Sequence, residues 1–278
     1  MQIEVRQASH PDAVRQAGTE ELRRHFLIER LFAPGEILLT YSHVDRLVVG
    51  GAVPMGQPLA LPTAKALGTA SFLERRELGI VNIGGPARVR VGDVPFSLDR
   101  LDVLYVGMGS GEVVLESAVP EDPAKLYLVS APAHHQHPIR HIAASAGRKL
   151  ERGDASHANE RTILQMIHPD ICASCQLVLG ITLLKPNNLW NTMPAHTHDR
   201  RSEAYLYFDL PAEARVFHFM GEPDHTRHMV VANEQAILSP GWSIHSGVGT
   251  MSYGFVWAMA GDNVEFDDMD MLAMESLR

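Results

Sequence analysis

The feature that most limits the fold of this chain is a long series of short apolar runs separated by turn residues. From Ile37 onward, β-branched and apolar runs recur every 8–12 residues or so, with glycine, proline and aspartate between them. Residues 87–91 alternate cleanly, and Gly92-Asp93 before residues 94–98 is typical of a tight hairpin turn. Many short strands at this spacing predict a mainly all-β fold, a sandwich or a barrel.

Two such series occur, and a polar stretch lies between them. The second series is expected at 176–184, 203–209, 215–220, 227–232, 235–238, 244–248 and 253–259. Residues 10–32 interleave charged and apolar side chains and predict one amphipathic helix or a pair of short ones. We therefore expect a first β-domain at 1–142, a linker at 143–175 with a short helix at 144–152, and a second β-domain at 176–278.

A weak internal repeat supports the division into two β-domains. Residues 101–109 resemble residues 234–242 in pattern, each reading as an apolar strand followed by a turn. The first copy has no His-x-His pair and no ligand histidine after its turn. The sequence thus predicts two small tandem barrels, with a metal site only in the second.

Composition excludes several classes of function. The chain has 278 residues, of which 45% are hydrophobic and 21% charged, and a net charge of −9 with no basic run. A nucleic-acid partner requires a basic face, so none is expected. The N-terminus has no apolar signal segment, and no apolar stretch reaches the roughly 18 residues of a membrane span. We expect a cytoplasmic protein without a membrane partner.

One stretch carries the pattern of a metal site. His196 and His198 are two residues apart, so in a strand both side chains point to the same face. Glu203 begins the next apolar run, and His245 follows a Pro-Gly turn some forty residues later. Three imidazoles and one carboxylate suit a borderline divalent ion such as zinc, with room for water or substrate.

Three other groups of residues have two interpretations each. Cys172 and Cys175 form a Cys-x-x-Cys pair, but no second pair accompanies them, and two reduced, partly buried thiols are expected. The histidines at positions 134, 135, 137 and 141 are expected in an exposed loop bounded by prolines rather than at a second metal. For His225 and His228 we expect hydrogen-bonded side chains that face the interior of the second barrel.

The histidine and glutamate spacing resembles the two sequence motifs of the cupin superfamily. The second motif departs in one respect, because Gly241 is one place early and Trp242 stands where glycine is usual. The glycine usual after the glutamate is also missing, and Leu210-Pro211 lies there instead. A closer resemblance, to the 5-keto-4-deoxyuronate isomerase family, runs essentially end to end on the segments 41–46, 72–79, 189–194, 242–250 and 266–270.

This resemblance implies a zinc-binding bicupin of two jelly-roll barrels, hexameric, that takes part in bacterial pectin and uronate breakdown. It implies one Zn²⁺ per chain, bound by His196, His198, Glu203 and His245. The implied activity is that of an aldose-ketose isomerase: a 5-keto-4-deoxyuronate with an aldehyde at C1 becomes its 2,5-diketo isomer. No organic cofactor is expected, because the chain has no dinucleotide or P-loop glycine motif.

The sequence leaves the other catalytic groups open. A base near the C2 proton is required unless a hydride shifts, and the acidic pair Asp267-Asp268 is one candidate, with a solvated tail as the alternative. The cation for the substrate carboxylate has five candidates: Arg161, Lys185, Arg200, Arg201 and Arg227. Two other functions also fit four such ligands, a metal-dependent cupin dioxygenase and a non-catalytic sugar-binding cupin.

Overall fold

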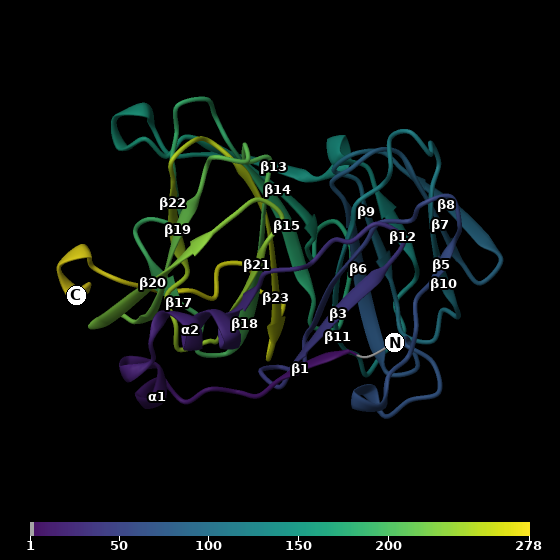
Figure 1. Ribbon diagram of the computed structural model, residues 1–278, viewed down its shortest axis with the longest axis horizontal. Helices are drawn as coiled ribbons and strands as arrows, with labels where there is room; N and C mark the ends of the chain where they lie inside the picture. The colour runs from purple at the N-terminus through teal and green to yellow at the C-terminus, as the bar shows by residue number, and fades with distance from the viewer. Residues whose placement is uncertain (1–2) are drawn as a thin grey trace.

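The computed structural model describes residues 3–278 and consists of four stacked β-sheets with a short helical segment. Figure 1 shows the two halves of the chain side by side, with purple and blue strands in one half and mainly green to yellow strands in the other. Each half contains one seven-stranded and one four-stranded sheet. The expected mainly all-β fold is therefore confirmed.

The first half begins the stack. Its seven-stranded sheet contains, in spatial order, β1 (Glu4–Arg6), β3 (Ile37–Ser42), β4 (Val48–Ala52), β11 (Leu126–Pro132), β6 (Arg76–Asn82), β9 (Val103–Val106) and β12 (Arg140–Ile142). Its four-stranded sheet contains β5 (Leu59–Ala60), β10 (Val113–Ser117), β7 (Ala87–Val91) and β8 (Val94–Leu98). The hairpin predicted at Gly92-Asp93 is confirmed, because Val91 pairs with Val94 and Gly92 has a φ of 56°.

The second half repeats this arrangement. Its seven-stranded sheet contains β13 (Arg148–Arg152), β14 (Arg161–Ile167), β15 (Val178–Leu184), β23 (Gly254–Gly261), β18 (Arg201–Phe208), β21 (Ala236–Ser239) and β2 (Leu27–Ile28). Its four-stranded sheet contains β16 (Trp190–Asn191), β22 (Ser246–Gly249), β19 (Val216–Glu222) and β20 (His225–Val231). A further pair is formed by β17 (His196–Thr197) and β24 (Asp270–Met271). The two segments of the weak sequence repeat contribute β9 and β21, which hold the same place in their sheets.

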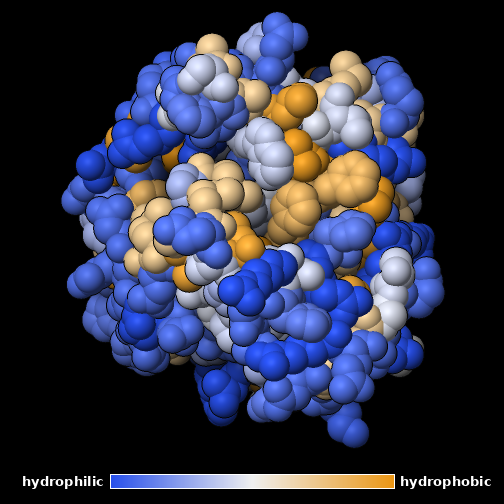
Figure 2. Space-filling model, turned by 90° about the vertical axis from the view of Figure 1, so that its left-hand side faces the viewer, coloured by the Kyte–Doolittle hydropathy of each residue, from blue (hydrophilic) through white to orange (hydrophobic). Residues whose placement is uncertain are grey.

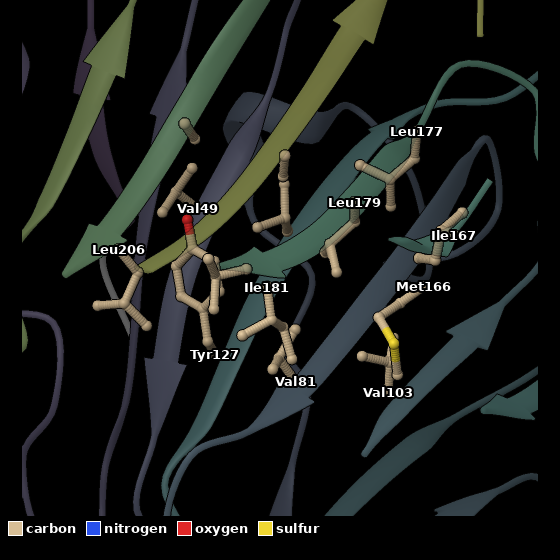
Figure 3. Close-up of a cluster of buried hydrophobic side chains, with 14 of the residues drawn as sticks. Val49, Val81, Val103, Tyr127, Met166, Ile167, Leu177, Leu179, Ile181 and Leu206 are labelled. Carbon is tan, nitrogen blue, oxygen red and sulfur yellow. The ribbon is translucent and has the colours of Figure 1, made fainter. Parts of the chain in front are cut away.

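Three apolar cores hold the four layers together. One fills the space between the two sheets of the first half, and a second lies between the two sheets of the second half. The third joins the halves, because the two seven-stranded sheets pack against each other face to face. Figure 3 shows this contact, with Val81 and Tyr127 of the first half beside Leu179 and Ile181 of the second. Burial on both faces explains why central strands of these sheets, such as β11 and β15, are almost continuously apolar.

The N-terminal segment packs on the second half rather than the first. The predicted pair of short helices is confirmed as α1 (Pro11–Gln16) and α2 (Thr19–Phe26). Leu22 and Phe26 of α2 are buried in the core of the second half, and β2 extends its seven-stranded sheet beside β21. Sequence proximity therefore does not predict the partner of this segment.

The stretch between the two strand series differs from expectation. The predicted helix at 144–152 is wrong: residues Ala144–Ala146 form a single 3₁₀ turn and β13 follows. Both β13 and β14 add to the seven-stranded sheet of the second half. The apolar signal of β13 is weak because this edge strand is exposed at four of its five positions. Three further 3₁₀ turns lie at Lys65–Leu67, Ala155–His157 and Met274–Ser276.

Among residues 3–278, none of the five sheets closes on itself into a barrel. In the same part of the chain, no helix is long and apolar enough to cross a membrane.

Candidate metal centre

Four side chains of the second half converge between its two sheets. His196 lies on β17, Glu203 on β18, and His245 immediately precedes β22. The Nε2 atom of His196 is 3.1 Å from that of His198 and 3.0 Å from that of His245. The Oε2 atom of Glu203 is 3.2 Å from Nε2 of His198 and 3.1 Å from Nε2 of His245. The structure thus brings the four residues singled out in the sequence together in one cluster.

Burial determines the charge of this cluster. His196 is 8% exposed and His245 is 1% exposed. Burial, followed by the neighbouring His198, lowers the pKa of His196 to about 3, and burial lowers the pKa of His245 well below its usual range. Both imidazoles are therefore neutral at physiological pH. A neutral imidazole has the free lone pair that a metal ligand requires.

The acidic C-terminal segment orients one of the histidines of this cluster. Nδ1 of His198 lies 3.0 Å from the main-chain oxygen of Asp268, which can only accept a hydrogen bond. Nδ1 therefore carries the proton, and the lone pair of Nε2 faces the cluster. Arg201 donates to the same oxygen at 2.7 Å, and β24 pairs with β17 beside it.

The acidic pair Asp267-Asp268 lies outside the cavity that opens on this cluster. The Asp268 carboxylate accepts two hydrogen bonds of 2.8 Å from Nε of Arg200, which, as the largest cause, hold the pKa of Asp268 far below its usual value. Asp267 is exposed, and neither aspartate lines the cavity described below. The segment contacts the cluster through a backbone atom, the Asp268 oxygen beside His198. The sequence pattern does not reveal this contact.

The unusual glycine position of the second motif has a steric reason. Gly241 packs against the loop that follows the His-x-His pair, and its main-chain oxygen accepts from the His198 N–H at 3.1 Å. A Cβ atom at this position would lie 2.6 Å from the main-chain oxygen of His198. Trp242, in contrast, contacts Phe26 of α2 edge-on, with ring centroids 6.4 Å apart. Only the earlier of the two positions requires glycine.

A cavity of about 280 Å³ opens on the cluster. Its titratable lining includes His196, His198, Glu203 and two arginines, Arg152 and Arg161. The remaining wall is mainly apolar: Ile163, Met193, Pro194, Phe255, Trp257, Met259, Phe266, Met269 and Met271, with the hydroxyls of Thr182, Thr192 and Tyr205. A largely apolar wall with a few convergent polar groups is typical of a small-molecule site.

The donor set fits a divalent metal ion. Metal–ligand bonds of about 2.0–2.2 Å place neighbouring ligand atoms of a tetrahedral site roughly 3.3 Å apart. The separations in the cluster, 3.0 to 3.2 Å, are close to this value. All four donor atoms lie within 4.8 Å of one another, and all four residues are buried. Among residues 3–278, no second group of three or more such side chains occurs.

The other candidate residues lie elsewhere. Burial raises the pKa of the Cys172 thiol to about 11, so this cysteine stays an unreactive thiol at neutral pH. Of the histidines at 134–141, His141 contacts Asp102 at 2.9 Å, and His135 packs edge-on against His137. His225 and His228 do not face the interior of the second half as expected, because both are exposed on β20.

The histidine that does face the interior of the second half is His218. It is fully buried on β19, and its Nδ1 atom is 2.8 Å from the hydroxyl of Tyr207. The sequence could have indicated this burial, because Val216, His218 and Met220 alternate along β19 and therefore lie on the same face of the strand.

Four of the five candidate cations are engaged outside the cavity. Arg200 pairs with Asp268 and Asp270, and Lys185 lies 3.2 Å from Glu151. Arg201 bonds to the Asp268 carbonyl, and Arg227 donates to main-chain oxygens of the helical segment. Arg161 alone of the five lines the cavity.

Comparison with curated proteins gives full-length relatives. The chain is 54% identical over 274 residues to 4-deoxy-L-threo-5-hexosulose-uronate ketol-isomerase 2 of Rhizobium meliloti, covering 99% of this chain and 97% of that protein. It is 51% identical over 276 residues to 4-deoxy-L-threo-5-hexosulose-uronate ketol-isomerase of Halalkalibacterium halodurans, covering 99% of this chain and 100% of that protein. A ketol-isomerase is an intramolecular oxidoreductase.

Solved structures show the same fold at lower identity. An IolB-like protein from Salmonella typhimurium matches with a TM-score of 0.68 and 18% identity, over 81% of this chain and 87% of that one. Oxalate decarboxylase from B. subtilis matches with a TM-score of 0.55 and 10% identity, over 81% and 71% of the two chains. Residues 27–274 match the KduI/IolB family. The chain, with its buried cluster of three histidines and one glutamate, therefore belongs to the KduI/IolB family.

Proposed function

We propose that this protein is a zinc-dependent ketol-isomerase that converts 4-deoxy-L-threo-5-hexosulose uronate to 3-deoxy-D-glycero-2,5-hexodiulosonate in pectin and uronate breakdown. The observation that carries the proposal is the buried cluster of His196, His198, Glu203 and His245 at the wall of a small-molecule cavity. The full-length relatives named for this reaction support the choice of substrate.

The reaction moves one hydrogen from C2 to C1 and one proton from the C2 hydroxyl to the C1 oxygen, and it leaves the carbon skeleton intact. The C1 aldehyde becomes an alcohol, and the C2 hydroxyl becomes the new ketone. A divalent ion held by the cluster supplies a positive charge that polarises the carbonyl and stabilises negative charge on its oxygen. No electron acceptor is required, which suits an ion without redox chemistry such as zinc.

The protein's own groups orient the substrate and exclude water. The hydroxyl of Tyr205 lies 3.4 Å from that of Thr192 on the wall beside Glu203. Burial raises the pKa of Tyr205 well above its usual value, so the phenol stays protonated and donates hydrogen bonds to substrate oxygens. The apolar side chains of Phe255, Trp257 and Met259 keep water from the reacting carbons.

The decisive experiment measures isomerisation with and without metal. Purified protein is depleted with a chelator, reloaded with zinc, and assayed on the unsaturated digalacturonate cleavage product. Loss of a charge stabiliser of this kind costs about 3–4 kcal/mol, so depletion is expected to slow turnover on the order of 10²–10³-fold, with recovery on reloading. A metal-free protein that turns over at the full rate contradicts the mechanism.

The same experiment separates the two alternative functions. Oxygen consumption by a protein that holds a redox-active metal identifies a dioxygenase. A loaded protein that binds the sugar acid without turning it over is a sugar-binding cupin.

We propose further that the chain is a bicupin with one metal per chain and with units at 1–142 and 176–278; the stretch at 143–175 between them adds β13 and β14 to the second unit. In the sequence repeat, Val106 corresponds to Ser239, and these residues pair with Leu78 and Glu203 respectively. Leu78 is fully buried in the apolar core of the first half. An aliphatic side chain thus stands where the second half has a ligand. Metal analysis that finds two ions per chain contradicts this proposal.

The protein is proposed to be a cytoplasmic homo-oligomer, a hexamer as the family resemblance implies. The outer face of the four-stranded sheet of the second half supports self-association, since Phe217 and Val230 pair across β19 and β20 and are 36% and 37% exposed. Figure 2 shows apolar side chains gathered in the middle of this side of the molecule, within a largely hydrophilic surface. Light scattering of the protein and of Phe217→Glu tests the assembly: a wild-type monomer contradicts it.

A further inference from the structure

The two arginines of the cavity lie directly opposite each other on neighbouring strands. Arg152 ends β13 and Arg161 begins β14, and they are direct cross-strand partners in the antiparallel pair. Like charges directly opposite each other on one face of a sheet repel and destabilise the pair. An anion bound between or beside the two guanidinium groups would offset this repulsion.

None of the side chains that the structure describes supplies such an anion. Within residues 3–278, neither Arg152 nor Arg161 forms an ion pair, and the hydrogen bonds they make go to main-chain oxygens. Nη1 of Arg161 donates to the Asn159 oxygen at 2.8 Å, which leaves most of its five donors free. The net charge of the chain is −9, so carboxylates are plentiful, yet the one on the cavity wall is Glu203 of the metal cluster.

The position of the pair points to the ligand of the cavity as the missing anion. Both arginines line the same cavity as the metal cluster, and Arg161 is half-buried there. Burial, with a contribution from Arg152, lowers the pKa of Arg161, although a guanidinium remains charged at neutral pH. A planar guanidinium with free donors binds a carboxylate through two parallel hydrogen bonds.

We infer that Arg161, assisted by Arg152, binds the carboxylate of the sugar acid and makes the cavity selective for uronates over neutral sugars. This inference rests on the proposed function for the identity of the substrate. The cluster then holds the aldehyde end of the chain while the arginines hold the acid end, so the two charged regions of the wall fix the direction of the substrate.

Kinetics of the zinc-loaded protein test the inference. Arg161→Gln is expected to raise KM for the uronate about 10- to 100-fold, with kcat changed only a few-fold, because a charge-assisted hydrogen-bonded pair is lost at a distance from the reacting carbons. Arg161→Lys keeps the charge but not the paired geometry, and Arg152→Gln removes the assisting cation; both should give smaller increases. Arg140→Gln, at an exposed arginine of β12 in the first half, is the matched control and should leave KM unchanged.

Stability separates a binding role from a structural one. Because the paired charges repel, Arg161→Gln should keep or raise the Tm of the ligand-free protein, and metal content should equal that of the wild type. A lower Tm with an unchanged KM shows that Arg161 only supports the fold through Asn159, and overturns the inference.

A binding measurement distinguishes failure of this inference from failure of the proposed function. Ligand-observed NMR compares D-galacturonate with the neutral D-galactose on the wild type and on Arg161→Gln. A wild-type preference for the acid that disappears in the variant supports the arginine site even if the protein shows no isomerase turnover. A wild type without preference, or a variant that retains it, overturns the inference even if isomerisation is observed.

Discussion

The contact between the halves allows one stability prediction to be worked from the structure. Glu77 of β6 is fully buried, and its carboxylate accepts four hydrogen bonds. Three come at 2.8 Å from the N–H groups of Cys175, Gln176 and Leu177, which precede β15 of the second half. The fourth comes at 2.7 Å from the hydroxyl of Tyr105. Glu77→Gln therefore tests how the first half fixes the start of the second.

The magnitude follows from what the amide can still accept. In the least costly orientation the amide oxygen still accepts from the N–H groups of Gln176 and Leu177. The amide NH₂ then faces the Tyr105 hydroxyl, which can accept a hydrogen bond, and the Cys175 N–H, which cannot. One unsatisfied buried N–H costs about 1–3 kcal/mol, and the two remaining bonds lose about half their strength without the charge. Easier burial of an uncharged amide offsets a part of this. We expect a loss of about 2–4 kcal/mol, a large fraction of the 5–15 kcal/mol typical of a domain.

Urea unfolding measures this loss. The chain has three tryptophans, all in the second half, whose fluorescence can follow unfolding at one protein concentration and metal content. Glu121→Gln, at an exposed glutamate of the first half, is the matched control and should change the unfolding free energy by less than about 0.5 kcal/mol. If Glu77→Gln is as stable as this control, the four hydrogen bonds do not fix the junction and the reasoning is wrong.

Three further predictions concern the second half. His198→Ala should abolish tight metal binding while circular dichroism still shows the β-fold, and full metal occupancy of the variant would refute the ligand assignment. Burial lowers the pKa of His218 to about 3, so the unfolded state, with a histidine pKa near 6.5, takes up a proton first as the pH falls. The contribution of His218 to the unfolding free energy is therefore fully present above about pH 6.5, and it declines between pH 6.5 and 3 by up to about 1.4 kcal/mol per pH unit. His218→Gln should flatten this decline in urea titrations. An unchanged dependence on pH would contradict the assignment. Gly241→Ala should cost about 1–3 kcal/mol in unfolding free energy and weaken metal affinity, because the new methyl group meets the main-chain oxygen of His198; calorimetric zinc titration with wild-type affinity would argue against it.

Local patterns in the sequence predict those features of the structure that depend on residues close together in the chain. The alternation of residues 87–91 and the Gly92-Asp93 turn predict a hairpin because side chains in a strand alternate between its faces. The spacing of His196 and His198 likewise predicts two ligands on one face, and Glu203 opens the next strand. Each of these features is determined over a few residues, so the chain order alone reveals it.

Features that depend on distant parts of the chain were not accessible in this way. The polar strand β13 has no apolar alternation because it is an exposed edge, and only its pairing with β14 sets Arg152 opposite Arg161. The Asp268 carbonyl orients His198 across 70 residues of sequence, through a backbone atom that every residue type carries. Residue identity and spacing therefore indicate the four residues of the cluster that could hold a metal ion, and most of the strands. The tertiary structure decides what surrounds the cluster, because the packing of sheets selects which arginine, carbonyl and aromatic side chains face one cavity.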